Sequence, residues 1–518
     1  MAVLCSRCRG DPDAADKQEV ICVMLEGNGC SACVERAAIR NKIERLEEEI
    51  IKLKAKYHAL GTTMNAIHDP FIHKFPPEIG SYIFHLGLPQ LNLEPIFPER
   101  DRTVFFRVLR LGAVCRKWRQ LAWATPNLWE ILSIVPPLER MHNVARSWPG
   151  LINEWLGRSG ELPLTISFAY NQNEFDDPEE FDGALERIIE VLTLHSSRWR
   201  NLRLYVDPRT LERLSGSMHL SQLLRLHILV YAAEPSSLST QKIVMKSRPF
   251  PTFLRLENLS PKSIDIGWNN ITTASLSMLT TDECAEVFRR APALEHFHLD
   301  EFPYSDGSIA HVNSFIIHPR IRSLNLPIEA RDFLNMINVP FLEEWTQHVN
   351  GDTFLVTAMV SLLQRSSCCL KILNLQDITP SQNQLVTLFQ ATPFLECLEM
   401  HFRRHNVAVY DILVRIFDSP PDQYSSHDSF LPRVQFLEFR GPWRVAPFSW
   451  DRIPDLYRLG HRCSLTLKSV INASETSDET AMELLKLVDH EGAKFLISDI
   501  GGGNFLGNLR KRIGREGR

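Results

Sequence analysis

Two cysteine pairs near the N-terminus are the residues best suited to chemistry in this 518-residue chain. Cys5 and Cys8 form one Cys-x2-Cys pair, and Cys30 and Cys33 form another after 21 intervening residues. Four thiolates can hold one zinc ion tetrahedrally, and a module too small for its own core needs that metal to fold. The spacing slightly exceeds the usual range of about 15–20 residues. The alternative is a flexible segment over residues 1–37 whose cysteines are incidental.

The composition bounds the class of protein. Eleven cysteines, an odd number, with no apolar leader in the first residues predict reduced thiols in the cytoplasm or nucleus. No run approaches 18 apolar residues, so we expect no membrane partner. A net charge of −5 argues against a nucleic-acid partner.

The sequence carries no recognisable catalytic motif. The zinc-protease, nucleophile-elbow and dinucleotide motifs are absent, and the glycine run 501–503 lacks the Gly-Lys-Ser/Thr of a phosphate loop. The 18 histidines do not group with carboxylates or cysteines at a catalytic spacing. We therefore expect a protein that recognises partners and is not an enzyme.

A heptad pattern occupies residues 38–69. Its apolar positions alternate in steps of four and three: Ile39, Ile43, Leu46, Ile50, Leu53, Tyr57, Leu60, Met64 and Ile67. Such a pattern with charged residues between predicts a coiled coil, and isoleucine alternating with leucine favours two parallel strands. Asp69-Pro70 ends the helix. A homodimer is one outcome, and a single helix folded back on its own domain is the other.

Residues 71–132 have the pattern of a small helical domain. Phe75-Pro76-Pro77-Glu78-Ile79 suits a helix start, since proline fits the first helical turn, and Ile79, Tyr82, Ile83 and Leu86 then recur at helical spacing. A second apolar stripe follows a proline-containing loop, and it comprises Val104, Val108, Leu111, Cys115, Trp118 and Ala122. The segment ends at Thr125-Pro126 and the pair Leu128-Trp129.

These motifs closely resemble the F-box, in particular the F-box-like domain of large protein families in mushroom-forming fungi. The resemblance implies that this segment binds an Skp-type adaptor, and through it a cullin. It assigns adaptor contacts to Phe75, Pro76, Pro77, Ile79, Ile83, Val114, Cys115, Trp118, Leu128 and Trp129. One departure from the family pattern is a longer loop, Gln90–Thr103, between the first two helices. The alternative is that the apolar stripes form only the domain's own core.

A repeat dominates residues 150–500. Residues 287–299 align without gaps on residues 388–400, an offset of 101 residues or about four units of 25. Further units are visible at 271–276, 321–326, 341–345, 370–375 and 434–439, each a short alternating strand, and helices are expected at Asp282–Arg290 and Gln384–Gln390. Units of about 20–29 residues with this strand pattern are leucine-rich repeats, which stack into a solenoid with a parallel sheet and a concave binding face. The alternative is an ordinary α/β domain with chance similarity.

The C-terminal residues 501–518 form a basic tail. Five of the nine residues from Arg510 to Arg518 are lysine or arginine. A nuclear signal or nucleic-acid contact is one interpretation, and a disordered, solvated end is the other.

The sequence thus predicts an α/β protein with a coiled-coil helix, a small helical F-box-like domain and an irregular leucine-rich-repeat solenoid. By the resemblance, it is a substrate-recognition subunit of an SCF-type cullin–RING ubiquitin ligase whose repeats bind an unknown target protein. The alternative is a non-catalytic leucine-rich-repeat scaffold, either monomeric or dimeric, that does not engage the ubiquitin machinery.

Overall fold

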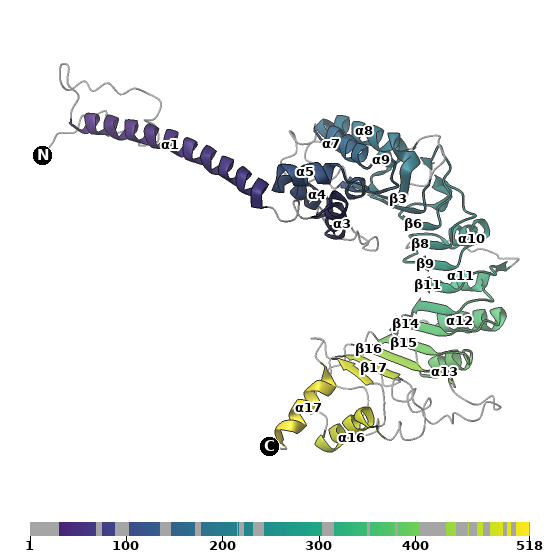
Figure 1. Ribbon diagram of the computed structural model, residues 1–518. Coiled ribbons are helices and arrows are strands. Elements are labelled where there is room, and N and C mark those ends of the chain that lie inside the picture. Colours follow the sequence, from purple (N-terminus) through teal and green to yellow (C-terminus); the bar gives the residue numbers. More distant parts are fainter. Residues whose placement is uncertain are drawn as a thin grey trace. The chain divides into compact units, whose positions relative to one another are not determined.

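The computed structural model shows an α/β protein with a long N-terminal helix, a group of short helices and a large parallel sheet (Figure 1). The structure describes residues 31–68, 75–88, 103–134, 147–170, 178–214, 216, 222–231, 243–302, 315–349, 353–378, 382–402, 431, 433–441, 454, 464–469, 477–490, 495–498 and 504–516. The chain divides into two compact units, and the sequence passes from one to the other between Leu128 and Trp129. None of the helices in these described residues has the length and apolar character needed to span a bilayer.

Helix α1 (Ser31–His68) confirms the helix that the heptads predict. Its 38 residues correspond to a length of about 57 Å at the α-helical rise. The helix begins before the predicted boundary, so residues 31–37 belong to it and not to a flexible segment. Cys33 therefore lies in its first turn, whereas Cys5, Cys8 and Cys30 lie outside the described residues.

Three short helices and a turn follow in the first unit. They are α3 (Pro77–Leu86), α4 (Thr103–Val114), α5 (Arg116–Trp123) and η2 (Pro126–Leu128). The second apolar stripe is not one helix, because Cys115 is extended, with φ −156° and ψ 171°. Its Sγ instead accepts the backbone N–H of Trp118 at 3.4 Å and caps α5. Arg119 Nε donates to the Gly112 carbonyl at 2.7 Å and ties α5 back to α4.

A small core holds these helices together. Phe84, Val108, Ala122 and Leu128 are buried. The Phe84 ring lies 4.7 Å from that of Trp118, between ring centroids, which joins α3 to α5. Gly112 in α4 allows the Trp123 ring of α5 to lie against the α4 backbone, since a Cβ at residue 112 would lie 2.0 Å from Trp123 Cζ3.

The second unit begins earlier than the sequence predicts. Strand β1 (Ile131–Ile134) pairs in parallel with β2 (Leu164–Tyr170) and so belongs to the sheet. Trp129 is fully buried, and its ring meets that of Trp155 in α7 (Trp148–Arg158) at 4.7 Å between centroids. The predicted boundaries at 132 and 150 are therefore wrong, because this tryptophan pair anchors the first strand.

The sheet has 14 parallel strands whose spatial order follows the chain. They are β1, β2, β3 (Trp199–Val206), β4 (Arg225–Val230), β6 (Phe253–Glu257), β8 (Thr273–Ser277), β9 (His296–Leu299), β11 (Ser323–Leu326), β13 (Glu344–His348), β14 (Ile372–Ile378), β15 (Cys397–Phe402), β16 (Phe436–Gly441), β17 (Ser464–Ser469) and β18 (Phe495–Ser498). Two further parallel pairs join β5 (Ile243–Val244) to β7 (Ile264–Asp265) and β10 (Ile316–Ile317) to β12 (Ile337–Asn338). Every predicted repeat strand coincides with or overlaps a strand of the sheet.

Helices follow the strands along the chain. They are α8 (Pro178–Leu194), α9 (Pro208–Arg213), α10 (Thr281–Arg290), α11 (Arg331–Met336), α12 (Thr353–Ser366), α13 (Gln382–Gln390), α16 (Asp478–Asp489) and α17 (Phe505–Glu516), with short turns η4 (Ser196–Arg198) and η6 (Pro261–Ser263). Contacts join α7 to α8, α10 through α13 in succession, and α16 to α17. Figure 1 shows α10 to α13 along one face of the sheet. The predicted helices at 282–290 and 384–390 are confirmed, and Thr280 with Glu283 forms a capping box for α10.

The core between strands and helices follows the alternation of each strand. In Leu254-Arg255-Leu256, for example, both leucines are fully buried while arginine lies on the opposite face. Between α10, β9 and α11, the rings of Phe288, Phe297 and Phe333 meet edge-on or tilted at 5.0 to 5.8 Å. This alternation leaves the other face of the sheet polar along most of its strands, whereas Ala169, Tyr205 and Leu229 form an apolar cluster on that face across β2 to β4.

The basic C-terminal segment is a folded helix over residues 505–516, which corrects the prediction of a disordered tail. Phe505, Leu506 and Leu509 of α17 are buried. Arg510 pairs with Asp489, and Arg512 pairs with Asp478 at 2.8 Å, so two of the basic side chains bind α16. Apolar residues at helical spacing among the arginines account for this fold.

Candidate docking face and polar sheet face

Helix α3 exposes an apolar stripe, which we call the docking face and define as Ile79, Tyr82, Ile83 and Leu86. These residues stand at i, i+3, i+4 and i+7 and therefore share one side of the helix. They are 44%, 60%, 39% and 64% exposed, respectively. Gly80 and Phe84, on the other side, are buried in the domain core. A helix that satisfies its core with one face and exposes four large apolar side chains on another is typical of a protein-binding surface.

The local sequence fixes how this face is presented. Pro76 has φ −56° and ψ 150°, and its carbonyl accepts the N–H groups of Ile79 and Gly80 at 3.0 and 3.1 Å. Ser81 and Thr125 hydroxyls are 2.8 Å apart, and Thr125 Oγ1 also donates to the Leu121 carbonyl at 2.7 Å. These contacts and the Phe84–Trp118 pair hold α3 by one side, so the docking face stays outward.

The predicted adaptor contacts separate into three groups. Phe75, Pro76, Pro77, Ile79, Ile83 and Val114 are exposed. Cys115 and Trp118 are half-buried, the first capping α5 and the second lying against Phe84. Leu128 and Trp129 are 1% and 0% exposed, so their assignment as contacts is wrong: both side chains serve the core.

Sequence reasoning left Tyr82 and Leu86 out of the contact set. The adaptor contacts were assigned from the positions of the family motif. Tyr82 and Leu86 lie outside that motif and join the exposed stripe only through their helical spacing after Ile79. The coiled-coil positions predicted in α1, from Ile39 to Leu60, are all exposed, by 48% to 76%. Of the four predicted zinc ligands only Cys33 is described, so the proposed metal site lies almost wholly outside the described residues.

A polar row crosses the second face of the sheet. One residue from each of thirteen strands stands in register with the next: Ser133, Ser167, Arg203, His227, Arg255, Ser275, His298, Asn325, Thr346, Asn374, Glu399, Glu438 and Thr466. The row is basic from β3 to β9 and acidic at β15 and β16. Of its ionisable members, Arg203, His227 and Glu438 are buried, whereas Arg255, His298 and Glu399 are half-buried. Only the half-buried side chains are accessible to a partner.

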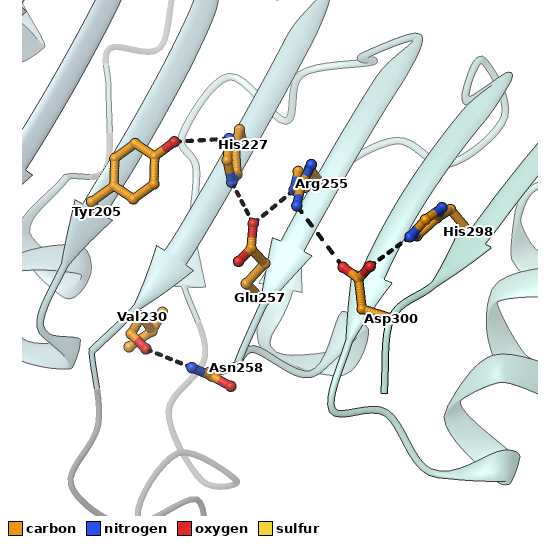
Figure 2. A network of polar contacts seen from close by, with 8 residues as sticks. All are labelled: Tyr205, His227, Val230, Arg255, Glu257, Asn258, His298 and Asp300. Atoms are coloured by element: carbon orange, nitrogen blue, oxygen red, sulfur yellow. Dashed lines mark hydrogen bonds and ion pairs between the residues drawn. The ribbon is translucent and has the colours of Figure 1, made fainter. Parts of the chain in front are cut away.

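The basic half of the row contains a connected network (Figure 2). His227 Nε2 lies 2.9 Å from Glu257 Oε1, and its Nδ1 lies 3.4 Å from the Tyr205 hydroxyl. Arg255 Nε donates to the same glutamate oxygen at 2.7 Å. The chain continues to Asp300, whose carboxylate lies 3.9 Å from Arg255 Nη2 and 2.5 Å from His298 Nε2. The residues therefore link four strands through side chains alone.

The protonation states follow from burial and charge. Burial raises the pKa of Tyr205 to about 12, so its hydroxyl stays protonated and donates to His227. Burial also lowers the pKa of His227, although the Glu257 carboxylate opposes this effect. For Glu257, burial raises the pKa, but hydrogen bonds and charge from His227 and Arg255 outweigh burial and hold the pKa below its ordinary value. A neutral imidazole, an ionised carboxylate and a guanidinium thus satisfy one another.

The network groups histidines with carboxylates in the fold, which their spacing in the sequence did not indicate. His227 and His298 each contact a carboxylate because the sheet brings residues of different strands, or of alternate positions, together. The sequence signal was present as a polar residue between two apolar ones, as in Leu226-His227-Ile228. The groups bind each other, and none of those in Figure 2 stands as an activated nucleophile beside a base.

The acidic half contains a second cluster. Ligand atoms of Glu399, His401 and Glu438 lie within 4.8 Å of one another. Asn374 Nδ2 donates to Glu399 at 2.8 Å, and Arg440 pairs with Glu438. Because an amide and a guanidinium already bind these carboxylates, the cluster fits the charge pattern of the sheet face without a metal ion.

No protein-family model matches this chain, and no curated protein matches it.

Proposed function

We propose that the chain is a substrate-recognition subunit of an SCF-type cullin–RING ubiquitin ligase. In this proposal residues 75–128 are an F-box-like domain that binds an Skp adaptor, and through it a cullin. The observation that carries the proposal is the docking face on α3, which follows the Phe75-Pro76-Pro77 motif. Four exposed apolar side chains on one short helix supply the buried anchors that a stable protein complex needs.

We further propose that the sheet and its helices are an irregular leucine-rich-repeat solenoid that holds the target. Strands β8, β9, β11, β13, β14 and β15 begin at residues 273, 296, 323, 344, 372 and 397, so successive starts lie 21 to 28 residues apart. That spacing, the parallel pairing and the strand order along the chain support this assignment. The sheet face that carries the polar row then meets the target protein through its half-buried side chains, such as Arg255, His298 and Glu399.

The protein's part in ubiquitination would be positional. Holding a target near a ubiquitin-loaded enzyme raises its effective concentration, and this requires no nucleophile or cofactor from the chain itself. The proposal assigns the protein to the cytoplasm or nucleus, where such ligases act. A scaffold of the same architecture that has no adaptor is the alternative.

The test is direct binding of the full chain to a purified Skp adaptor, followed by capture of the cullin. We expect a dissociation constant in the micromolar range or tighter for the wild-type protein. In the variant Ile79→Ala with Leu86→Ala, each truncation removes a side chain that is about half exposed in the free protein, so folding should survive. Each loses roughly 1 kcal/mol of new burial in the complex, and together they should weaken binding by at least about tenfold.

Leu194→Ala provides the matched control, because Leu194 is 74% exposed at the end of α8 in the other unit. It should leave adaptor binding unchanged. Failure of the wild-type chain to bind the adaptor or retain the cullin would refute the receptor function and favour the scaffold. Equal losses for the control and the α3 variant would place the docking face elsewhere.

A further inference from the structure

We infer that α1 pairs with the α1 of a second copy of this chain as a parallel, in-register, two-stranded coiled coil. This inference goes beyond the proposed function and does not depend on adaptor binding. It rests on two properties of α1 that are independent of each other, an exposed apolar stripe and the signs of the charges that flank it.

The stripe is continuous and uncovered within the described part of the chain. In heptad notation its a positions are Ile43, Ile50, Tyr57 and Met64, and its d positions are Ile39, Leu46, Leu53 and Leu60. All eight are between 48% and 76% exposed. Isoleucine at a with leucine at d is the combination that favours two parallel strands over three or four. The residues therefore suit a partner helix with the same pattern.

The flanking charges specify the orientation. The charged g positions are Glu35, Lys42, Glu49 and Lys56, and the charged e positions are Arg40, Glu47 and Lys54. Lys56 would face the uncharged Gly61, so three g–e pairs carry charge on both sides. In a parallel pair without a register shift, each g residue faces the e residue five positions later on the partner. The facing pairs are then Glu35 with Arg40, Lys42 with Glu47, and Glu49 with Lys54. All three are opposite in sign, and symmetry makes each pair occur twice.

This alternation identifies a second copy as the occupant. A partner of another kind would need its own e and g charges in the reverse order, whereas the chain already complements itself. A helix that folded back on its own unit would cover the stripe and would have no use for matched e and g signs. The charge pattern thus selects both the partner and the register.

Two charge-reversal variants of the full chain test the inference. The g variant carries Glu35→Lys, Lys42→Glu and Glu49→Lys. The e variant carries Arg40→Glu, Glu47→Lys and Lys54→Glu. Each variant alone places like charges opposite one another at all six contacts of a parallel dimer, and an equimolar mixture restores opposite charges at all six. A control with the same net charge change as the g variant, Glu44→Lys, Glu48→Lys and Lys52→Glu, alters only positions outside e and g.

The measurement is sedimentation equilibrium of the wild type, each variant and the mixture at low salt. We expect a wild-type dimer that the control variant leaves intact. Each reversal variant should raise the dimer dissociation constant at least about 100-fold, and the mixture should recover the wild-type value. Added salt should narrow these differences, because it screens exposed charges.

Three results would overturn the inference. A wild-type chain that stays monomeric up to about 100 µM would exclude the pairing. Dimers that survive in both reversal variants would indicate an antiparallel pair. In that arrangement g faces g and e faces e, so both members of each facing pair change sign together and their attraction or repulsion stays the same. Dimers that the control variant disrupts as strongly as the g variant would show that e and g have no special role.

Discussion

Replacing Glu257 by glutamine is expected to loosen the centre of the sheet. The residue is 8% exposed, and its carboxylate receives hydrogen bonds from His227 at 2.9 Å and Arg255 at 2.7 Å. Glutamine keeps the shape and one acceptor oxygen but removes the negative charge. The Arg255 guanidinium would then remain buried with only Asp300, 3.9 Å away, as an anionic partner.

The size of the effect follows from these contacts. Breaking a buried ion pair by removing one partner costs about 3–5 kcal/mol. The retained acceptor oxygen and the Asp300 carboxylate offset part of this, so we expect a loss of about 2–3 kcal/mol in local stability. A loss of that size raises amide exchange roughly 30- to 150-fold. Hydrogen exchange read by mass spectrometry on peptides covering β4 and β6 measures it without requiring two-state unfolding of the whole chain.

Glu343→Gln is the matched control. Glu343 also pairs with two cations, Lys371 at 3.0 Å and Arg322 at 3.6 Å, but its side chain is 41% exposed. An exposed pair contributes about 0–1 kcal/mol, so exchange in β13 and β14 should rise less than about fivefold. If the two variants perturb their own strands equally, burial does not set the strength of the network and the reasoning is wrong.

Three further outcomes are expected. Lowering the pH below about 6.5 should destabilise β4 to β6, because burial depresses the pKa of folded His227 and the unfolded chain therefore binds the proton more readily. Below about 4.5 the stabilisation from Glu257, whose pKa is also depressed in the folded state, should be lost as well. Amide hydrogen exchange, corrected for its intrinsic pH dependence, measures both losses of stability. Gly112→Ala should lower the free energy of unfolding by about 1–3 kcal/mol, because the new Cβ forces Trp123 to move. Gly61→Ala should stabilise α1, because nothing lies within 4 Å of the new Cβ and alanine favours the helix. Thermal unfolding followed by circular dichroism distinguishes the two effects. If the four N-terminal cysteines share a metal, elemental analysis of protein purified without chelator should find one zinc per chain, and its absence would reject the predicted cysteine site.

The sequence was sufficient to place the repeating strands but not their partners. Alternating leucines, as in Leu373-Asn374-Leu375, mark a half-buried strand wherever they occur, and residues 372–378 are such a strand. Strands β4 and β6, by contrast, were not predicted, since neither belongs to the gapless repeat. Which polar residues meet depends on register, and no local pattern in one strand specifies its neighbour's register. The network of Figure 2 was therefore invisible until the strands were aligned.

The short helices show a different limit. Helical spacing runs without a break from Val104 to Ala122, yet the chain turns at Cys115 because its side chain caps the next helix. The spacing of apolar residues indicates which residues face a common core, but it does not show whether the helix is continuous. Two helices that pack on one core can keep the same apolar spacing across the bend between them. In the C-terminal helix the many arginines masked the apolar residues at 505, 506 and 509, whose burial accounts for its folding, and two of the basic side chains pair with α16.

The strict agreement between strand order and chain order bears on how the protein is made. Each strand pairs only with the strands before and after it in the sheet, so no segment waits for a partner that is synthesised much later. A nascent chain leaving the ribosome can therefore add strands one at a time to an edge already formed, starting from the Trp129–Trp155 anchor. During synthesis the growing edge is always a free strand edge, open to mispairing with other chains. Helix α17, which contacts β18, is translated after every described strand of this sheet.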